Sequence, residues 1–416
     1  MGVLILSQKT KSGQHFKTAF MKHPKPQTDC ITAGRTAPLG GQAKTANVPI
    51  YQTSTILFDT FQELDQAYKI YHSGQESYTY GRKGTPTSLA LCEALATLEG
   101  GHAAYIAPSG LAAVSTALLS QVGAGDHVFV TDNVYAPTRH LCDGLLARMG
   151  VRTTYYDPLI GADIADLIEP NTKVIYMESP GSLTLEIQDV PAICQAAAAR
   201  NIVTIIDNTW ASPLFFKPFD HGVDIVIQAV TKYLGGHSDV MMGAVIANEK
   251  TYRSVRAGAH DLGQFAGSMD IAMVLRGLRT LSVRLKEHEK NALVIAQWFE
   301  QQPQVARVHH PALASHPQHA LWKRDFLGSS GLFSVEFKPE YQPDALNAMV
   351  ENYQYFGIGF SWGGFESLAL PVHPDYLGQI RSHAHTRNSL IRYHMGLEHT
   401  DDLLADLANG LNSLTL

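Results

Sequence analysis

The sequence contains 416 residues, of which 45% are hydrophobic and 17% charged, a composition typical of a globular protein with a large core. Its formal net charge of −6 gives no electrostatic reason to expect binding to nucleic acid or to an anionic membrane. No apolar run approaches the roughly 20 residues that a membrane-spanning helix needs, and the length predicts two or three domains.

The first twenty residues contain only "VLIL" as an apolar run. This run is too short for a secretory signal, so we interpret the segment as an extension or an upstream start, with Met21 as an alternative beginning. The four cysteines, Cys30, Cys92, Cys142 and Cys194, are far apart and form no C-x-x-C pair. Their spacing argues against a metal cage and favours reduced thiols in a cytoplasmic protein.

From residue 87 onward, helical and strand-like segments alternate. The runs "TSLALCEALATLEGG" and "SGLAAVSTALLSQVG" have apolar residues at helical spacing, and the first ends at a pair of glycines. Short, nearly continuous apolar runs then predict strands, namely "HVFVTD", "KVIYMES", "IVTIIDN", "DIVIQAV" and "GAVIAN". Helical segments such as "VPAICQAAAARN" separate the first few. This alternation predicts an α/β fold with a doubly wound, mainly parallel sheet that is buried on both faces.

The pattern changes from about Ser268, where a long helical stretch, "MVLRGLRTLSVRLKEHEKNALVIAQWFEQQ", begins soon afterwards. Strand-like pieces such as "GLFSVEF" and "IRYHMG" follow it and predict a smaller α/β domain at the C-terminus. We therefore expect a large domain over residues 83–275 and a small domain over residues 276–416. Residues 1–82 are rich in Thr, Gly and Pro, and we interpret them as an extension and arm that contacts a neighbouring subunit.

Several polar side chains follow predicted strands, at the edge of a doubly wound sheet where ligands bind. Asp207 ends "IVTIID", Lys232 follows "IVIQAVT", and Tyr135 follows "HVFVTDNV". Ser109 and Gly110 begin a helix, whose free N–H groups would suit a phosphate. Each feature alone has a commonplace explanation, because a lysine after a strand usually starts a solvated loop and an aspartate there is often a turn residue.

Together, however, these residue types are the ones that pyridoxal phosphate (PLP) requires. A lysine bonds to the aldehyde, and a carboxylate keeps the pyridine nitrogen protonated so that the ring acts as an electron sink. An aromatic side chain stacks on the ring, and the start of a helix holds the phosphate. Partial burial of the lysine would also favour its neutral amine, which is a nucleophile and a base. The set predicts PLP as the cofactor.

A series of motifs occurs in a fixed order along the chain: "YTYGRKGTPT", "LATLEGG", "MESPGS", "DNTWASPLFFKP", "TKYLGGHSD", "RGLRTLSVRL", "KRDFLGSSGLFS", "SWGGFESL" and "GLEHTDDLLADL". In this order they resemble the Cys/Met-metabolism PLP-dependent enzymes, over essentially the whole chain from about Asp29. The resemblance implies the type I fold of PLP-dependent transferases, which is aspartate aminotransferase-like. That fold has a large doubly wound sheet domain and a smaller C-terminal domain.

The resemblance also implies cofactor ligands. Lys232 would bond to the PLP aldehyde, Asp207 would pair with the pyridine nitrogen, and Tyr135 would stack on the ring. Lys232 and Tyr135 would be the catalytic residues. The phosphate ligands from within the subunit would be Gly110, Leu111 and Thr231.

Further implied roles concern the substrate and the assembly. Tyr80 and Arg82 would complete the phosphate site of a neighbouring subunit, which implies a homo-oligomer, expected to be a tetramer built from dimers with shared active sites. Arg392 would bind the substrate carboxylate with two parallel hydrogen bonds. Ser361, Trp362 and Tyr80 would line the pocket for a small sulfur amino acid.

Two departures from the broad family pattern are informative. Ala229 stands three residues before the lysine, where many members have a serine, so one hydroxyl to the phosphate is missing or is supplied elsewhere. Many γ-acting members have an asparagine at the position of Ser182 and lack a tryptophan at the position of Trp362. The second departure favours the β-lyase branch, which would cleave L-cystathionine, and other cysteine S-conjugates, by β-elimination.

Two alternatives stay open. A γ-acting member would use the same fold and cofactor but release 2-oxobutyrate and cysteine from cystathionine, whereas β-cleavage gives pyruvate, ammonia and homocysteine. The second alternative is a regulator that binds PLP but catalyses no reaction. The joint presence of Lys232, Asp207, Tyr80, Arg82 and Arg392 argues against a regulator, which would need few of them.

The remaining polar clusters are interpreted structurally. The segment "VHHPALASHPQH" brings together His309, His310, His316 and His319. A metal site is one interpretation, but a loop interrupted by prolines is more often solvated surface, so we predict no metal site. His237 is expected to hydrogen-bond locally and fix the loop after Lys232. Residues 287–289 are expected to form an exposed helix face of mixed charge.

Overall fold

The computed structural model describes residues 24–35, 45–75, 77–372, 380 and 389–414. Its described strands form two sheets, one with the order β1-β7-β6-β5-β4-β2-β3 and one with the order β10-β11-β9-β8. The first sheet consists of β1 (Ala103–Ala107), β2 (His127–Thr131), β3 (Arg152–Tyr156), β4 (Thr172–Glu178), β5 (Val203–Asp207), β6 (Ile225–Gln228) and β7 (Gly243–Ala247). The second consists of β8 (Val305–His309), β9 (Leu332–Phe337), β10 (Leu368–Pro371) and β11 (Leu390–His394).

The larger sheet is mainly parallel, because only β7 runs against its neighbours β1 and β6. Successive residues of its strands point into two separate apolar clusters: on β5, Ile206 belongs to one cluster and Ile205 to the other. Both faces are therefore buried, as near-continuous apolar runs require. The predicted doubly wound, mainly parallel sheet is confirmed.

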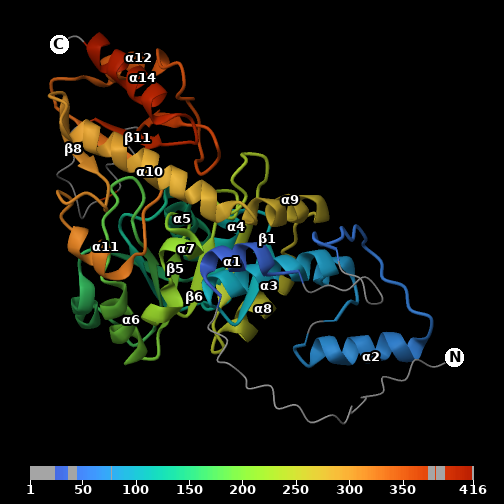
Figure 1. Ribbon diagram of the computed structural model, residues 1–416. Coiled ribbons are helices and arrows are strands. Elements are labelled where there is room, and N and C mark those ends of the chain that lie inside the picture. The colour runs from blue at the N-terminus through green and yellow to red at the C-terminus, as the bar shows by residue number, and fades with distance from the viewer. Residues whose placement is uncertain (1–23, 36–44, 76, 373–379, 381–388, 415–416) are drawn as a thin grey trace, which may run out of the picture.

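Helices cover both faces of this sheet (Figure 1). The helices α3, α6, α9 and α10 contribute to one apolar cluster, and α4 and α8 contribute to the other. The described α-helices are α1 (Pro26–Thr32), α2 (Phe61–His72), α3 (Pro86–Glu99), α4 (Gly110–Leu119), α5 (Ala136–Leu141), α6 (Val190–Ala198), α7 (Ser212–Phe215), α8 (Tyr252–Asp261), α9 (Ser268–Leu278), α10 (Leu281–Glu300), α11 (His319–Asp325), α12 (Pro343–Glu351) and α14 (Thr400–Ser413). None of the described helices is long and apolar enough to cross a membrane.

The structure differs from the predicted elements in two respects. The long helical stretch is broken into α9 and α10 at Thr280, whose hydroxyl donates to the carbonyl of Gly277, so that the side chain competes with the helical pattern. The strands β1 and β3 were not predicted. The first is rich in alanine, and the second has the edge position and partly exposed side chains that weaken an apolar signal.

The smaller sheet is antiparallel and packs against α10, where Phe299 meets Phe333 and Tyr393. One cluster of buried apolar residues extends from the larger sheet through α10 to this smaller sheet. The boundary expected between residues 275 and 276 falls inside α9, so the division into a large and a small domain stays a prediction.

The N-terminal arm is described from residue 24, and Met21 lies outside the described residues. The helix α2 lies at the periphery of the chain (Figure 1). Around it, Leu57 is 88% and Phe61 is 91% exposed, which leaves large apolar side chains in water. The ring of Tyr71 connects α2 to α8 through a hydrogen bond between its hydroxyl and His260 Nδ1.

Two of the structural interpretations were wrong. His309, His310 and His316 are buried rather than solvated. His309 ends β8, and its Nε2 lies 3.1 Å from the Glu336 carboxylate of the neighbouring strand β9. Among the described residues, no group of three or more His, Cys, Asp or Glu side chains is placed to hold a metal ion. The helix face at residues 287–289 is not wholly exposed either, since His288 packs against Tyr233 in the core.

Candidate active site

Lys232 lies in a tight turn just after β6. The turn is fixed by backbone hydrogen bonds from Lys232 N to Ala229 O, 2.9 Å, and from Gly236 N to Lys232 O, 2.8 Å. His237 Nδ1 lies 2.8 Å from Gly235 O, so the expected local hydrogen bond of this histidine is confirmed. The glycines and this imidazole hold the turn, which places the lysine at the carboxyl edge of the sheet.

The Lys232 amine is partly buried and donates a hydrogen bond to Ser361 Oγ. Burial lowers the pKa of Lys232 to about 8, the positive charge of Arg392 acts in the same direction, and Asp207 opposes both. With that pKa, about a tenth of the amine is neutral at neutral pH, far more than for a solvated lysine. The side chain is therefore prepared to act as a nucleophile and a base.

Ser361 connects this amine to Arg392. Its hydroxyl accepts from Lys232, and its carbonyl oxygen accepts from Arg392 Nη2 at 3.1 Å. The backbone of Ser361 has a φ of 80°, a left-handed conformation that a serine adopts at a cost of roughly 1–3 kcal/mol. Such strain is retained where the surroundings dictate the conformation. Here the conformation directs the Ser361 hydroxyl to Lys232 and the Ser361 carbonyl to Arg392.

The segment 361–364, which we call the substrate loop, packs directly on the backbone of Lys232. A Cβ at Gly363 would lie 2.9 Å from Tyr233 N and 3.0 Å from Lys232 Cα, and Gly363 has a φ of +88°. Only glycine fits both demands. Trp362 precedes Gly363 in this loop, and the centroid of its ring lies 5.4 Å from Lys232 Nζ. The loop thus forms one wall around the amine.

Arg392 comes from β11 of the smaller sheet and faces the same region. Burial lowers the pKa of Arg392 to about 10, and the nearby Tyr135 hydroxyl raises it. The guanidinium stays charged at neutral pH, and its planar fork suits a carboxylate. A partly buried cation beside an amine is the arrangement needed to hold an amino acid by its carboxylate.

Two carboxyl groups end neighbouring parallel strands. Asp207 on β5 and Glu178 on β4 are direct partners in the register of the sheet. Asp207 Oδ1 accepts from the backbone N–H of Thr209 at 2.9 Å, and Glu178 Oε2 accepts from the backbone N–H of Tyr135 at 2.8 Å. These bonds fix both carboxyls and place the Tyr135 backbone beside the acid pair.

The two acids are not equivalent electrostatically. Burial and the charge of Asp207 raise the pKa of Glu178 well above its usual range. Burial also raises the pKa of Asp207, but the Thr209 hydrogen bonds and the charge of Lys232 oppose the increase. Because like charges so close cannot both ionise easily, the Glu178 carboxyl, whose pKa increase the Tyr135 N–H alone opposes, has the stronger tendency to hold a proton.

The N-terminus of α4 lies against the residue three positions before Lys232. A Cβ at Gly110 would lie 2.9 Å from the Cβ of Ala229, so only glycine allows this approach. The Ser109 hydroxyl accepts from Ala112 N at 3.1 Å, whereas the N–H groups of Gly110 and Leu111 have no partner within the part of the chain that the structure describes. Free N–H groups at a helix start are a natural anion site.

Thr231 differs from these free donors. Its hydroxyl donates to Met242 O at 3.1 Å and accepts from Met242 N at 2.9 Å. To donate to a phosphate, Thr231 would have to give up its bond to the Met242 carbonyl. Gly110 and Leu111 are therefore the better prepared phosphate donors of the three.

The chemistry of this set fits PLP. An amine of lowered pKa is available for an aldehyde, a buried carboxylate for a protonated ring nitrogen, and free helix N–H groups for a phosphate. The profile of the family described as "Cys/Met metabolism PLP-dependent enzyme" matches residues 27–412. The chain belongs to this family.

Named relatives agree with this assignment. Cystathionine beta-lyase of Escherichia coli (strain K12) is 42% identical over 396 residues, which cover 94% of this chain and 99% of the relative. L-alanine/L-glutamate racemase of Wolbachia pipientis wMel is 42% identical over 375 residues, 88% of this chain and 93% of the relative. The crystal structure of cystathionine gamma-lyase from Lactobacillus plantarum has a TM-score of 0.85 and 33% identity, covering 94% of this chain and 99% of that one.

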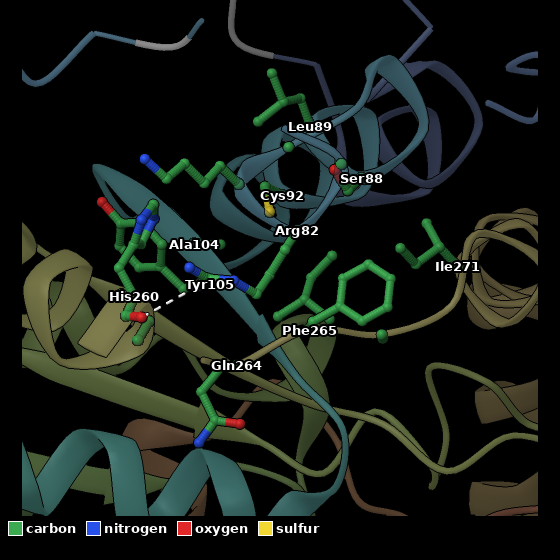
Figure 2. A pocket seen from close by; sticks show the side chains of 16 residues that line it. Arg82, Ser88, Leu89, Cys92, Ala104, Tyr105, His260, Gln264, Phe265 and Ile271 are labelled. Carbon is green, nitrogen blue, oxygen red and sulfur yellow. Dashed lines mark hydrogen bonds between the residues drawn. The ribbon is translucent and has the colours of Figure 1, made fainter. Parts of the chain in front are cut away.

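Tyr80 and Arg82, the two family residues expected to act across an interface, lie elsewhere in this chain. Arg82 Nη1 donates to His260 O at 3.1 Å and lines a pocket between α3, β1 and α8 with Lys83 and Tyr105 (Figure 2). Of the described residues that line this pocket, none belongs to the group around Lys232. Tyr80 is 45% exposed. A role for this pair at a Lys232 amine would require a second chain.

Glu178 lies beside Asp207 and bonds to the Tyr135 backbone, and the sequence prediction missed it. It ends the predicted strand "KVIYMES" just as Asp207 ends "IVTIID". The rule that selected Asp207 would therefore have selected Glu178 as well. The sequence does not predict the hydrogen bond between Glu178 and the Tyr135 backbone, because the two residues are 43 positions apart and meet only in the folded chain.

Proposed function

We propose that this protein is a PLP-dependent carbon–sulfur β-lyase that cleaves L-cystathionine and, less selectively, other cysteine S-conjugates. The observation that carries the proposal is Ser361, which links the Lys232 amine to the Arg392 guanidinium. This link sets a base and a carboxylate receptor at a fixed separation. The 42% identity to a cystathionine beta-lyase over nearly the full length supports the choice of substrate.

The chain's own residues divide the binding task. Arg392 holds the substrate carboxylate with its planar fork. Ser361 and Trp362 line the pocket beside it, and Tyr80 of a neighbouring subunit reaches the same pocket. The carboxylate fixes the substrate's orientation, so that the proton on Cα points to the Lys232 amine, as orientation-dependent proton transfer requires.

Lys232 then moves protons. Its neutral Nζ takes the proton from the substrate Cα, and bound PLP supplies the electron sink that makes this carbon acidic. The Cβ–S bond breaks with its electron pair going to sulfur, which receives a proton from Lys232 Nζ and leaves as homocysteine. Water completes the balance, since the remaining three carbons leave as pyruvate and ammonia.

We further propose how the chain holds the cofactor. Lys232 would bond to the aldehyde until the substrate amine replaces it, which frees Nζ to act as the base. Asp207 would pair with the ring nitrogen, and Tyr135 would stack on the ring. The phosphate would be held by Gly110, Leu111 and Thr231 of one subunit and by Tyr80 and Arg82 of another. The Glu178 carboxyl supports this set by fixing the Tyr135 backbone.

A homo-oligomer with shared active sites, expected to be a tetramer built from dimers, follows from that assignment. The exposed apolar side chains of the arm, such as Leu57 and Phe61, offer a surface for the neighbouring subunit. Mixing the inactive variants K232A and R82A tests this. Random reassociation should restore about a quarter of wild-type activity, because half of the dimers are hybrids with one complete site in two. No recovery after mixing would contradict sharing of the site.

The function is tested by incubating the holoenzyme with L-cystathionine and identifying the products. Pyruvate and homocysteine are expected, and the K232A variant should form neither above background. The exposed Lys286 of α10 provides the control, since K286A should keep wild-type turnover. Near-normal pyruvate formation by K232A would rule out the role of Lys232, and 2-oxobutyrate with cysteine would make the enzyme γ-acting.

Racemisation is a second candidate, favoured by the 42% identity to an L-alanine/L-glutamate racemase. It needs the same proton abstraction from Cα, followed by return of the proton to the opposite face. Formation of D-alanine from L-alanine by the holoenzyme, measured beside pyruvate formation, compares the two activities directly. A racemase rate above the lyase rate would reverse our ranking.

A cytoplasmic location is also proposed. It is supported by the four cysteines, none of which forms a disulfide in the described part of the chain, and three of which are buried.

A further inference from the structure

Two buried histidines lie behind the substrate loop. His394 belongs to β11, His288 belongs to α10, and their ring centroids are 5.2 Å apart. Both are at most 1% exposed. His394 Nδ1 and His288 Nε2 have no hydrogen-bond partner among the described residues, which is costly for polar atoms in a core. Each of these two neighbouring rings therefore has one nitrogen without a partner among the described residues.

The hydrogen bonds of the second nitrogens fix both tautomers. Gly363 N–H donates to His394 Nε2 at 3.1 Å, so this nitrogen carries a lone pair and the proton is on Nδ1. Gly364 O lies 3.2 Å from the same atom, but a proton there would face the Gly363 N–H. His288 Nδ1 lies 2.7 Å from Met395 O, which can only accept, so His288 carries its proton on Nδ1 and a lone pair on Nε2.

The two unsatisfied atoms are thus complementary, one a donor and the other an acceptor. Burial keeps both rings neutral, since it lowers the pKa of His288 to about 4 and the pKa of His394 well below its ordinary value. A buried polar atom without a protein partner usually bonds to an ordered water. A single water between His394 Nδ1 and His288 Nε2 would satisfy both.

We propose that His394 is a positioning residue for the substrate loop, anchored through one buried water to His288. The resulting series of bonds runs from Gly363 N–H through His394, the water and His288 to the carbonyl of Met395. It ties the loop to α10 and to the residue after β11. The inference rests on the proposed function only where it says that this loop binds the substrate.

The anchor acts on the substrate through its neighbours in the loop. Gly363 follows Ser361 and Trp362 directly, and Ser361 contacts both Lys232 and Arg392. If Gly363 loses its acceptor, the strained Ser361 conformation has less support, and the Arg392 fork is less well oriented for a carboxylate. The primary effect should fall on substrate binding, because His394 touches neither the substrate nor the cofactor in this arrangement.

The experiment compares two substitutions of His394 in the holoenzyme. H394L removes the acceptor for Gly363 N–H, whereas H394Q can place an amide oxygen at the same position. H394L should raise KM for L-cystathionine about tenfold with kcat within about threefold, and H394Q should return KM to within about threefold of wild type. H140L, which changes an exposed histidine of α5, is the control and should match wild type.

A third variant tests the water link. H288N can keep the donor to Met395 O but lacks the outer nitrogen. It should raise KM about threefold alone and add nothing to H394L, because residues that act through one series of bonds are not additive. Fully additive effects of H288N and H394L would show that the two rings act separately.

A readout independent of activity is deuterium exchange of the substrate loop in the cofactor-loaded protein. H394L should speed exchange of a peptide containing residues 361–364 about tenfold, while the core strand β5 keeps its wild-type rate. This measurement stands even if the wild type fails to cleave L-cystathionine. Unchanged KM and exchange in H394L would overturn the proposal. An H394Q variant as impaired as H394L, with cofactor content and unfolding midpoint falling together, would reduce His394 to a packing residue.

Discussion

Glu99, at the end of α3, offers a test of how the carboxyl edge of the sheet is held together. Its carboxylate accepts from Asn208 Nδ2 at 3.3 Å and from Gln228 Nε2 at 2.5 Å. Asn208 adjoins the acid Asp207, and Gln228 ends β6, four residues before Lys232. Glu99 is 1% exposed, so its protonation changes a buried charge beneath the site. The perturbation is E99Q, which keeps the shape and removes the charge.

The size of the expected change in the free energy of unfolding follows from the shift in the pKa of Glu99. Burial raises the pKa of Glu99 to about 7 from an ordinary 4.5, against the opposing effects of Lys217, Gln228 and Asn208. A raised pKa means that the folded chain holds this proton more tightly than the unfolded chain. The corresponding stability is fully present below pH 4.5 and is lost as the pH rises through about 7, a total of about 3 kcal/mol.

The assay is equilibrium urea unfolding of wild type and E99Q at equal cofactor concentration. From about pH 5 to about pH 8, the wild type should lose about 2.5 kcal/mol relative to E99Q, because glutamine cannot ionise. E340Q, which changes an exposed glutamate, should track the wild type at every pH. Parallel pH profiles for wild type and E99Q would refute the reasoning, since Glu99 would then not titrate differently in the two states.

Further predictions concern the site itself. In cofactor-free protein, acylation of Lys232 followed by mass spectrometry should have a midpoint near pH 8, and R392Q should raise that midpoint, because a positive charge that opposes protonation is removed. S361G and S361A should both lower kcat/KM, because both lose the hydroxyl. In urea unfolding, S361G should be more stable than S361A by about 1 kcal/mol, because glycine accepts a φ of 80° without strain. G363A should destabilise by roughly 1–3 kcal/mol more than G74A, since both positions have φ near +90° but only at Gly363 would the new methyl meet the backbone, 2.9 Å from Tyr233 N. Equal unfolding midpoints for G363A and G74A would contradict the close packing of the substrate loop.

The core of the fold was predictable because apolar runs report burial on both faces. The segments "HVFVTD", "KVIYMES", "IVTIIDN", "DIVIQAV" and "GAVIAN" became β2, β4, β5, β6 and β7. The reversed direction of β7 has no signal in a single strand, because direction depends on the turn at Lys232 and the pairing across it. Buried histidines were misjudged for a related reason: composition marks His309 and His288 as polar, but each finds its partner on a distant element.

The candidate site was predictable to the extent that its residues follow strands or begin a helix. Asp207, Lys232 and Gly110 lie where strand ends and a helix start place them. Arg392 and Ser361 entered only by resemblance to a family, since neither position follows from periodicity. Ser361 bonds to Lys232 across 129 residues of sequence, and Arg392 bonds in turn to Ser361, so only three-dimensional packing brings the three together. Glu178, which the same rule as Asp207 should have found, was overlooked.

The base and its receptor come from different sheets, and this has a chemical consequence. Lys232 follows β6, whereas Arg392 belongs to β11, and the guanidinium charge is one reason why the pKa of Lys232 is low. A substrate carboxylate on Arg392 would offset that charge, so the amine should become a stronger base only when the substrate is bound. The lysine-labelling experiment can examine this hypothesis with acetate or propionate as a simple carboxylate. The pH midpoint of Lys232 acylation should rise in wild type when the carboxylate is added and stay constant in R392Q. An unchanged midpoint in wild type would mean that Arg392 does not couple carboxylate binding to the basicity of Lys232.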